Sequence, residues 1–242
     1  MKVFPASLFA SAPALALFRE EMGLAREYAM RQPNGRALLL APTRSAAPDW
    51  TVAHLQPVHL HVAGNGLDGD VRCAAASLAW ENAAFQMIVV QHVCDVLPDV
   101  AALISELERV LAPGGALIWF GFNPRSPWFA WCQWHAWRDR TAAAERLSRR
   151  HSVAMPTMHR HLFGQRLQSD ELRYVGSCWP RASQAASLPA PRWRALDALR
   201  AAYVLVVRNR PQVLTPLRAR AARPAAASRP HLVSTPSQRA SA

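Results

Sequence analysis

The sequence predicts an α/β fold with a Rossmann-like, doubly wound, mainly parallel sheet of about seven strands and flanking helices. Two observations carry this prediction. Residues 85–91 form a short apolar run with three consecutive β-branched side chains, which is typical of strands that parallel sheets bury on both faces. An amphipathic helical pattern and a second apolar run follow, and a strand, a helix and a strand in this order form a right-handed parallel unit.

The residues before this unit predict a helix and three strands. Apolar side chains at helical spacing indicate an amphipathic helix over residues 11–31. A Pro-Asn-Gly break ends this helix, and the bounded apolar run 37–41 predicts the first strand. Alternating residues at 58–63 predict a second strand that ends in a turn at 64–66, and residues 71–74 indicate a short third strand.

The parallel unit and the residues after it complete the prediction. The helix covers residues 99–111, ends at Pro-Gly-Gly, and is followed by a strand at 116–121. Residues 123–137, rich in Trp and Pro, predict a loop leading to a helix that continues to Arg150, and residues 203–207 predict a late strand. We therefore expect an N-terminal helical segment at 1–34, the α/β domain at 35–210 and a basic, disordered tail at 211–242.

Composition narrows the classes of partner. The net charge is +12, and residues 208–242 hold seven Arg and no acidic residue. A basic tail can contact nucleic acid, but this one lacks interleaved aromatic residues, which favours a solvated tail. The four cysteines show no CxxC pairing, which fits a reducing cytoplasm. We expect no signal peptide, no membrane span and no metal site, since the pairs His59/His61 and His159/His161 lack neighbouring Cys or acidic clusters.

The central segment carries several motifs in order. They are Phe-Gln-Met-Ile-Val-Val-Gln-His-Val-Cys-Asp-Val from residue 85, Arg-Val-Leu-Ala-Pro-Gly-Gly from residue 109, and Gly-Phe-Asn-Pro from residue 121. This set resembles class I S-adenosylmethionine-dependent methyltransferases, and among them a bacterial subgroup of methyltransferase type 11-like proteins. The resemblance implies the fold predicted above and S-adenosylmethionine as the cofactor.

The resemblance also implies where the cofactor binds. Cofactor-binding positions are expected at the carboxyl ends of the strands, namely Ala41, Thr43, Ser77, Leu78, Gln91 and His92. The family has glycines after its first strand, whereas this chain has Ala-Pro-Thr-Arg-Ser, so the glycine-rich cofactor loop is degenerate. The family also has an acidic residue after its second strand, for which Asn65 or Asp68 is a possible replacement here.

Three residues are candidates to act on the acceptor. His92 is a candidate base or a residue lining the methionine end, His159 is a second candidate base, and Asn123 is a candidate for orienting the acceptor. Each has a structural alternative: His92 as a hydrogen-bonded histidine and Asn123 as part of a turn. Leu78, likewise, either flanks an adenine or packs under a surface loop.

Two functions follow from these patterns. The first is an S-adenosylmethionine-dependent methyltransferase of unknown acceptor. The alternative is a degenerate methyltransferase fold that binds no cofactor and acts as an interaction or scaffold protein, because of the altered first loop.

Overall fold

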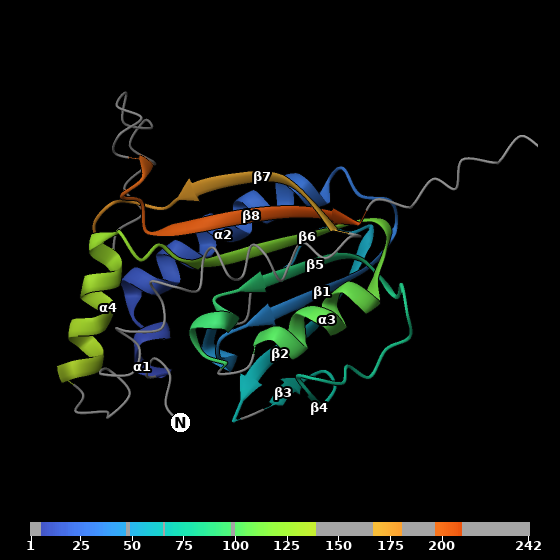
Figure 1. Cartoon of the computed structure of the whole chain (residues 1–242), viewed down its shortest axis with the longest axis horizontal. Coiled ribbons are helices and arrows are strands. Elements are labelled where there is room, and N and C mark those ends of the chain that lie inside the picture. The colour runs from blue at the N-terminus through green and yellow to red at the C-terminus, as the bar shows by residue number, and fades with distance from the viewer. Residues whose placement is uncertain are drawn as a thin grey trace, which may run out of the picture. The chain divides into compact units, whose positions relative to one another are not determined.

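One eight-stranded sheet organises the described residues of this computed structural model, which are 6–46, 49–64, 66–97, 100–138, 167–180 and 197–209. The strand order is β4-β3-β2-β1-β5-β6-β8-β7 (Figure 1). All of these residues belong to one compact unit of the chain, Met1–Gln212.

The centre of the sheet consists of four parallel strands in the order β2-β1-β5-β6. They are β1 (Gly35–Ala41), β2 (Leu55–Ala63), β5 (Phe85–Gln91) and β6 (Leu111–Phe122). Each contains one of the predicted strands 37–41, 58–63, 85–91 and 116–121, so these four predictions are confirmed. The side chains of residues 37–41 and 87–91 are all buried, as expected for strands covered on both faces.

Antiparallel pairs extend the sheet on both sides. β3 (Gly66–Gly69) pairs with β2 and β4 (Cys73–Ala74) pairs with β3, while β8 (Ala202–Asn209) pairs with β6 and β7 (Leu167–Val175) pairs with β8. The late strand predicted at 203–207 is thus confirmed as part of β8, and the short strand predicted at 71–74 as β4. The patterns did not predict β3 or β7.

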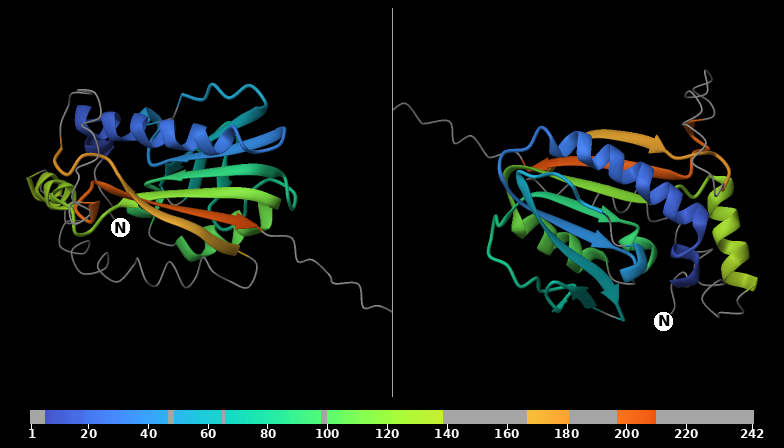
Figure 2. Two further views of the ribbon diagram at one scale, coloured as in Figure 1. Left: turned by 90° about the horizontal axis from the view of Figure 1, so that it is seen from above. Right: turned by 180° about the vertical axis from the view of Figure 1, so that it is seen from behind.

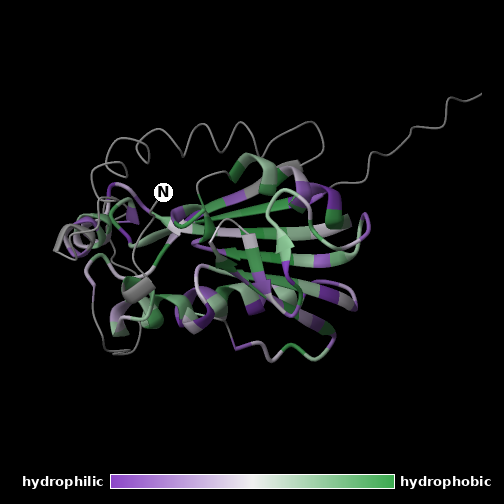
Figure 3. Ribbon diagram, turned by 90° about the horizontal axis from the view of Figure 1, so that it is seen from below, coloured by the Kyte–Doolittle hydropathy of each residue, from purple (hydrophilic) through white to green (hydrophobic). Residues whose placement is uncertain are grey.

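Helices cover both faces of the sheet. The long helix α2 (Ala12–Ala29) lies on one face and α3 (Val100–Val110) on the other (Figure 2). Leu39 and Val89 face α2, whereas Leu38 and Val90 belong to the core on the α3 side. This alternation along β1 and β5 confirms the doubly wound prediction, and the strands in Figure 3 are correspondingly hydrophobic.

A third apolar cluster closes one end of the sheet. It joins α1 (Ala6–Phe9), the first half of α2 and α4 (Pro127–Arg138) to the end of β6. Phe9, Phe18 and Phe122 stack within it, with ring centroids 6.2 and 6.3 Å apart for the pairs Phe9–Phe18 and Phe9–Phe122. The N-terminal helices therefore pack directly on the α/β core.

Several predictions lie outside the described residues. These are the helix continuing to Arg150, the tail at 211–242, Asn65, His159 and His161. Among the described helices, none is both long enough and apolar enough to cross a membrane.

Candidate functional site

The carboxyl ends of the parallel strands meet at one edge of the sheet. β1 ends at Ala41, β2 at Ala63, β5 at Gln91 and β6 at Phe122. We call these ends and the residues that follow them the carboxyl rim. Open α/β sheets bind ligands outside this edge, so it is the candidate functional site.

The turn that follows β5 has an unusual backbone. His92 adopts the left-handed conformation (φ 50°, ψ 21°) and donates its backbone N–H to Phe120 O at 3.0 Å. The 3-10 turn η2 (Val93–Asp95) begins directly after it. A non-glycine residue in this conformation persists when the surrounding structure holds it, and such residues cluster at functional sites.

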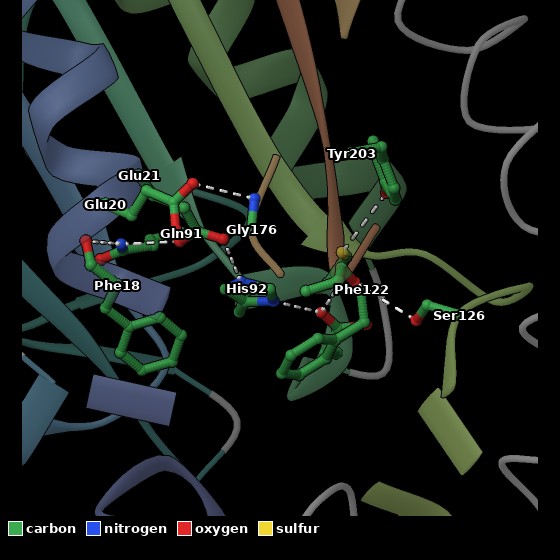
Figure 4. A network of polar contacts seen from close by, with 12 residues as sticks. Phe18, Glu20, Glu21, Gln91, His92, Phe122, Ser126, Gly176 and Tyr203 are labelled. Carbon is green, nitrogen blue, oxygen red and sulfur yellow. Dashed lines mark hydrogen bonds and ion pairs between the residues drawn. The ribbon is translucent and has the colours of Figure 1, made fainter. Parts of the chain in front are cut away.

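The side chain of His92 is held between two carboxylates. Its Nε2 lies 2.9 Å from Glu21 Oε1 of α2, and its Nδ1 lies 2.9 Å from Asp95 Oδ2 (Figure 4). All three side chains are at most 2 % exposed. The rings of Phe18 and Phe122 flank the imidazole, with centroids 5.1 and 4.1 Å away.

This arrangement fixes the charge of His92. Carboxylates only accept hydrogen bonds, so both ring nitrogens donate and the ring is an imidazolium. Burial by itself lowers the pKa of His92, but the charges and hydrogen bonds of Glu21 and Asp95 outweigh it and raise the pKa to about 9. His92 is therefore protonated at neutral pH and has no free ring nitrogen in this structure.

Gln91 extends the same network. Its Nε2 donates to Glu21 Oε2 at 2.8 Å and to the backbone oxygen of Phe18 at 3.1 Å. Its Oε1 is buried without a hydrogen-bond partner, although Gln91 is only 1 % exposed. A buried amide oxygen without a partner is uncommon and suits a hydrogen-bond donor from outside the described chain.

The loop after β1 contains no glycine. Ala41 is buried, Thr43 is half-buried, and the hydroxyls of Thr43 and Ser45 lie 3.1 Å apart on the surface. A single 3-10 turn, η1 (Arg44–Ala46), follows. This loop thus presents small side chains and hydroxyls where a glycine-rich loop would present bare backbone.

The segment containing Ser77 and Leu78 is fastened to α3. Ser77 is exposed and Leu78 is buried in the core on the α3 side. Glu106 accepts the backbone N–H of Leu78 at 2.8 Å, and the Arg109 guanidinium donates to the carbonyls of Leu78 and Trp80 at 3.1 and 2.8 Å. The ion pair between Glu106 and Arg109 of α3 therefore holds the backbone of Leu78 and Trp80 in place.

Asn123 ties the end of β6 to the segment before β8. Its Nδ2 donates to the carbonyls of Ala198 and Arg200 at 2.8 and 2.9 Å, and its Oδ1 accepts the backbone N–H of Arg125 at 3.1 Å. The residue is 2 % exposed. In this structure the side-chain amide of Asn123 binds three backbone groups. The contact of Asn123 with a methyl acceptor stays a prediction.

Comparison with known families adds the decisive observation about this site. Residues 36–119, from the start of β1 into β6, match the family model described as "Methyltransferase domain". The chain is similar to methyltransferase domains over this segment. Its carboxyl rim is formed largely by the matched segment, because Ala41, Ala63 and Gln91 all lie within it.

Solved structures similar to this chain are distant from it in sequence. An S-adenosyl-L-methionine-dependent methyltransferase of Methanococcus maripaludis has 11% identity and a TM-score of 0.48, covering 86% of this chain and 91% of the other. A methyltransferase of Bacillus halodurans has 14% identity and a TM-score of 0.44, covering 78% and 99%. A structure of the Haloferax volcanii Trm112 methyltransferase activator in complex with a methyltransferase has 10% identity and a TM-score of 0.47, covering 85% and 96%. No curated protein matches the chain.

The structure brings only some of the predicted site residues together. Gln91 and His92 share one network, and Ala41 ends the strand beside them, since Leu40 pairs with Val90 in the parallel register. Ser77 and Leu78 follow β4, beyond β2 in the strand order. Three residues that hold the site were missed by the sequence patterns: Glu21, Asp95 and Arg109.

One prediction concerns the buried Asn123 at the end of β6. Asn123→Ala is expected to lower the free energy of unfolding by about 1–3 kcal/mol, because it removes three hydrogen bonds between a buried amide and partly buried backbone groups. Asn123→Asp, which keeps the acceptor but loses both donors, is expected to be at least as destabilising. Urea denaturation measures both, with the exposed Asn34→Ala as the control; stability equal to the control would contradict the tethering role.

Proposed function

We propose that the protein is an S-adenosylmethionine-dependent methyltransferase whose acceptor is not yet identified. The observation that carries this proposal is the match of residues 36–119 to the methyltransferase family, because the matched segment supplies three of the four strand ends of the carboxyl rim. A ligand at that edge follows the general rule for open α/β sheets.

The residues of the rim fit part of the cofactor. Gln91 Oε1, a buried acceptor without a partner, suits the ammonium group of a methionine moiety. Ala41 and Thr43 would lie along the cofactor, and Ser77 with Leu78 would border the adenine. For the ribose hydroxyls the described residues near the end of β2 offer Asp68, a half-buried residue of β3 that pairs with His61.

The proposed methyl transfer needs few catalytic groups from the protein. When bound, S-adenosylmethionine supplies a methyl group on a sulfonium whose leaving group is neutral. The protein then has to align the acceptor with that methyl group and exclude water. His92 has both ring nitrogens occupied by carboxylates, so in this arrangement its part is to shape the rim.

The burial of the carboxyl rim favours a second candidate function, that of an interaction protein that binds no cofactor. Ala41, Gln91 and His92 are at most 1 % exposed, and α1, α2 and α4 pack over the end of the sheet. A cofactor that touches Gln91 or His92 binds only when α1 and α4 move away from this end while α2 stays on the strand ends, which lowers its apparent affinity by the fraction of open molecules. A protein that never opens would be a cofactor-free interaction protein.

The cellular location and the partners of the protein are also proposals. Cys73, Cys94 and Cys132 are free thiols, which supports a reducing compartment such as the cytoplasm. We propose that the chain divides into an N-terminal helical segment at 1–34, the α/β domain at 35–210 and the basic tail at 211–242. Contact between this tail and a nucleic acid is the less favoured use of the tail.

Calorimetry with S-adenosylmethionine and S-adenosylhomocysteine separates the two functions. Binding of either ligand supports the methyltransferase, and no binding at millimolar ligand overturns it in favour of the cofactor-free protein. Ser77→Trp, at an exposed predicted cofactor residue, is expected to weaken binding about 10-fold or more by filling the adenine place. Ser105→Trp, at an exposed position of α3, is the matched control and should bind like the wild type.

A further inference from the structure

Glu21 connects the leading helix to the carboxyl rim. It lies on α2 and is fully buried, and its two oxygens accept hydrogen bonds from Gln91 Nε2 at 2.8 Å and His92 Nε2 at 2.9 Å. These partners are the last residue of β5 and the first residue after it. A buried carboxylate needs such partners, so the contact fixes α2 against this strand end.

The connection continues beyond His92 to a second strand. Asp95 Oδ2 accepts from His92 Nδ1 at 2.9 Å and also from the backbone N–H of Phe122 at 3.2 Å. Phe122 is the last residue of β6. A continuous series of hydrogen bonds therefore runs from α2 through the turn after β5 to the end of β6 (Figure 4).

The strained backbone lies in the middle of this series. His92 holds a left-handed conformation that most non-glycine residues avoid, and both of its ring nitrogens are fastened. Because the side chain cannot move without losing a buried ionic contact, the direction in which the chain leaves β5 depends on Glu21 and Asp95.

We propose that Glu21 is a positioning residue for the carboxyl rim, holding the turn after β5 and the end of β6 in the conformation that receives the cofactor. It acts through His92 and Asp95 and need not touch the cofactor. The part of this inference that concerns the cofactor rests on the proposed function. A simple buried ion pair, by contrast, would contribute to stability alone.

The charged groups around His92 make the proposal testable by pH. Glu21 faces it from α2 and Asp95 from η2, whereas the neighbouring rings of Phe18 and Phe122 are uncharged. Cys94, Cys132 and Tyr203 lie near Asp95, but burial raises the pKa of each well above its usual value, so they stay neutral.

Glu21→Gln removes the negative charge of residue 21 and keeps the shape of its side chain. The new amide oxygen can still accept from His92, and its NH2 group can meet Gln91 Oε1 if the Gln91 amide turns over. Glu27→Gln, at an exposed position of the same helix, is the matched control. Both variants are compared with the wild type under conditions where each is fully folded by circular dichroism.

The expected result is a pH-dependent loss of affinity. For Glu21→Gln the dissociation constant of S-adenosylhomocysteine should rise about 10-fold at pH 8 and less at pH 6, where a larger fraction of His92 is protonated. The wild type and Glu27→Gln should differ little between these pH values. Equal affinities for all three folded proteins at both pH values would overturn the inference.

A second measurement does not need the cofactor. Hydrogen exchange of the Phe122 amide should be about 10-fold faster in Glu21→Gln than in Glu27→Gln, since Asp95 is then less firmly held. If the wild type binds no cofactor, the proposed function fails and this measurement still decides the positioning role. Equal exchange in the two variants would overturn it.

Discussion

His92→Ala is expected to lower the free energy of unfolding by about 3–5 kcal/mol. The imidazolium is the common partner of Glu21 and Asp95, and all three side chains are at most 2 % exposed. Without it, two carboxylates remain close together in a buried region with no cation between them. Removing one member of a buried ionic cluster is therefore more damaging than removing the whole cluster.

Urea denaturation at pH 7 measures this loss. His61→Ala, at a half-buried position of β2, is the matched control and should change stability by less than about 1 kcal/mol. Adding Glu21→Gln to His92→Ala removes one of the unpaired charges, so the double variant should be more stable than His92→Ala alone. A double variant that is less stable would show that lost packing, and not unpaired charge, dominates.

The sequence predicted the parallel core because its residues obey local rules. Residues 85–91 contain three consecutive β-branched side chains at 88–90, and they form β5 with the predicted ends. The helical stripe at 99–111 became α3, whose buried positions Leu103, Ile104 and Leu107 are three and four residues apart. In both cases one element's own pattern is enough to specify it.

The antiparallel edges depend on pairing that local patterns do not contain. β3 has the sequence Gly-Leu-Asp-Gly, which resembles a loop, and it is a strand because it pairs with residues 60–63 of β2. Gly69 has no room for a side chain there, since an added Cβ would lie 2.2 Å from His59 O. β7 carries Glu171 and Arg173 in its middle and is placed by its pairing with β8.

The candidate site was predictable only in part. His92 and Asp95 are three residues apart in one turn, so their pairing left a local signal. Glu21 also left one, because it lies between Phe18 and Ala25 on the apolar side of an otherwise amphipathic helix. Its partner is 71 residues away, however, and no spacing rule joins a helix position to the end of a strand that distant in the chain.

The stability of the wild-type protein is expected to fall by about 2–3 kcal/mol between pH 6 and pH 8.5. The pKa of His92 is raised from 6.5 to about 9 in the folded protein. Below pH 6.5 the folded and unfolded chains both hold this proton, and the stabilisation is fully present. As the pH rises toward 9 only the folded chain retains the proton, so each further pH unit lowers the free energy of unfolding.

Urea denaturation across this pH range, at constant ionic strength, tests the sign and the source of the effect. His92→Ala lacks the titrating group, so its stability should change much less with pH than that of the wild type. The buried Cys94 and Tyr203 have pKa values raised well above their usual values, so they remain neutral in the folded protein over the whole range. A wild-type stability that stayed level or rose from pH 6 to pH 8.5 would mean that the cluster of His92, Glu21 and Asp95 does not retain this proton in the folded protein, and that the pKa of His92 is not raised.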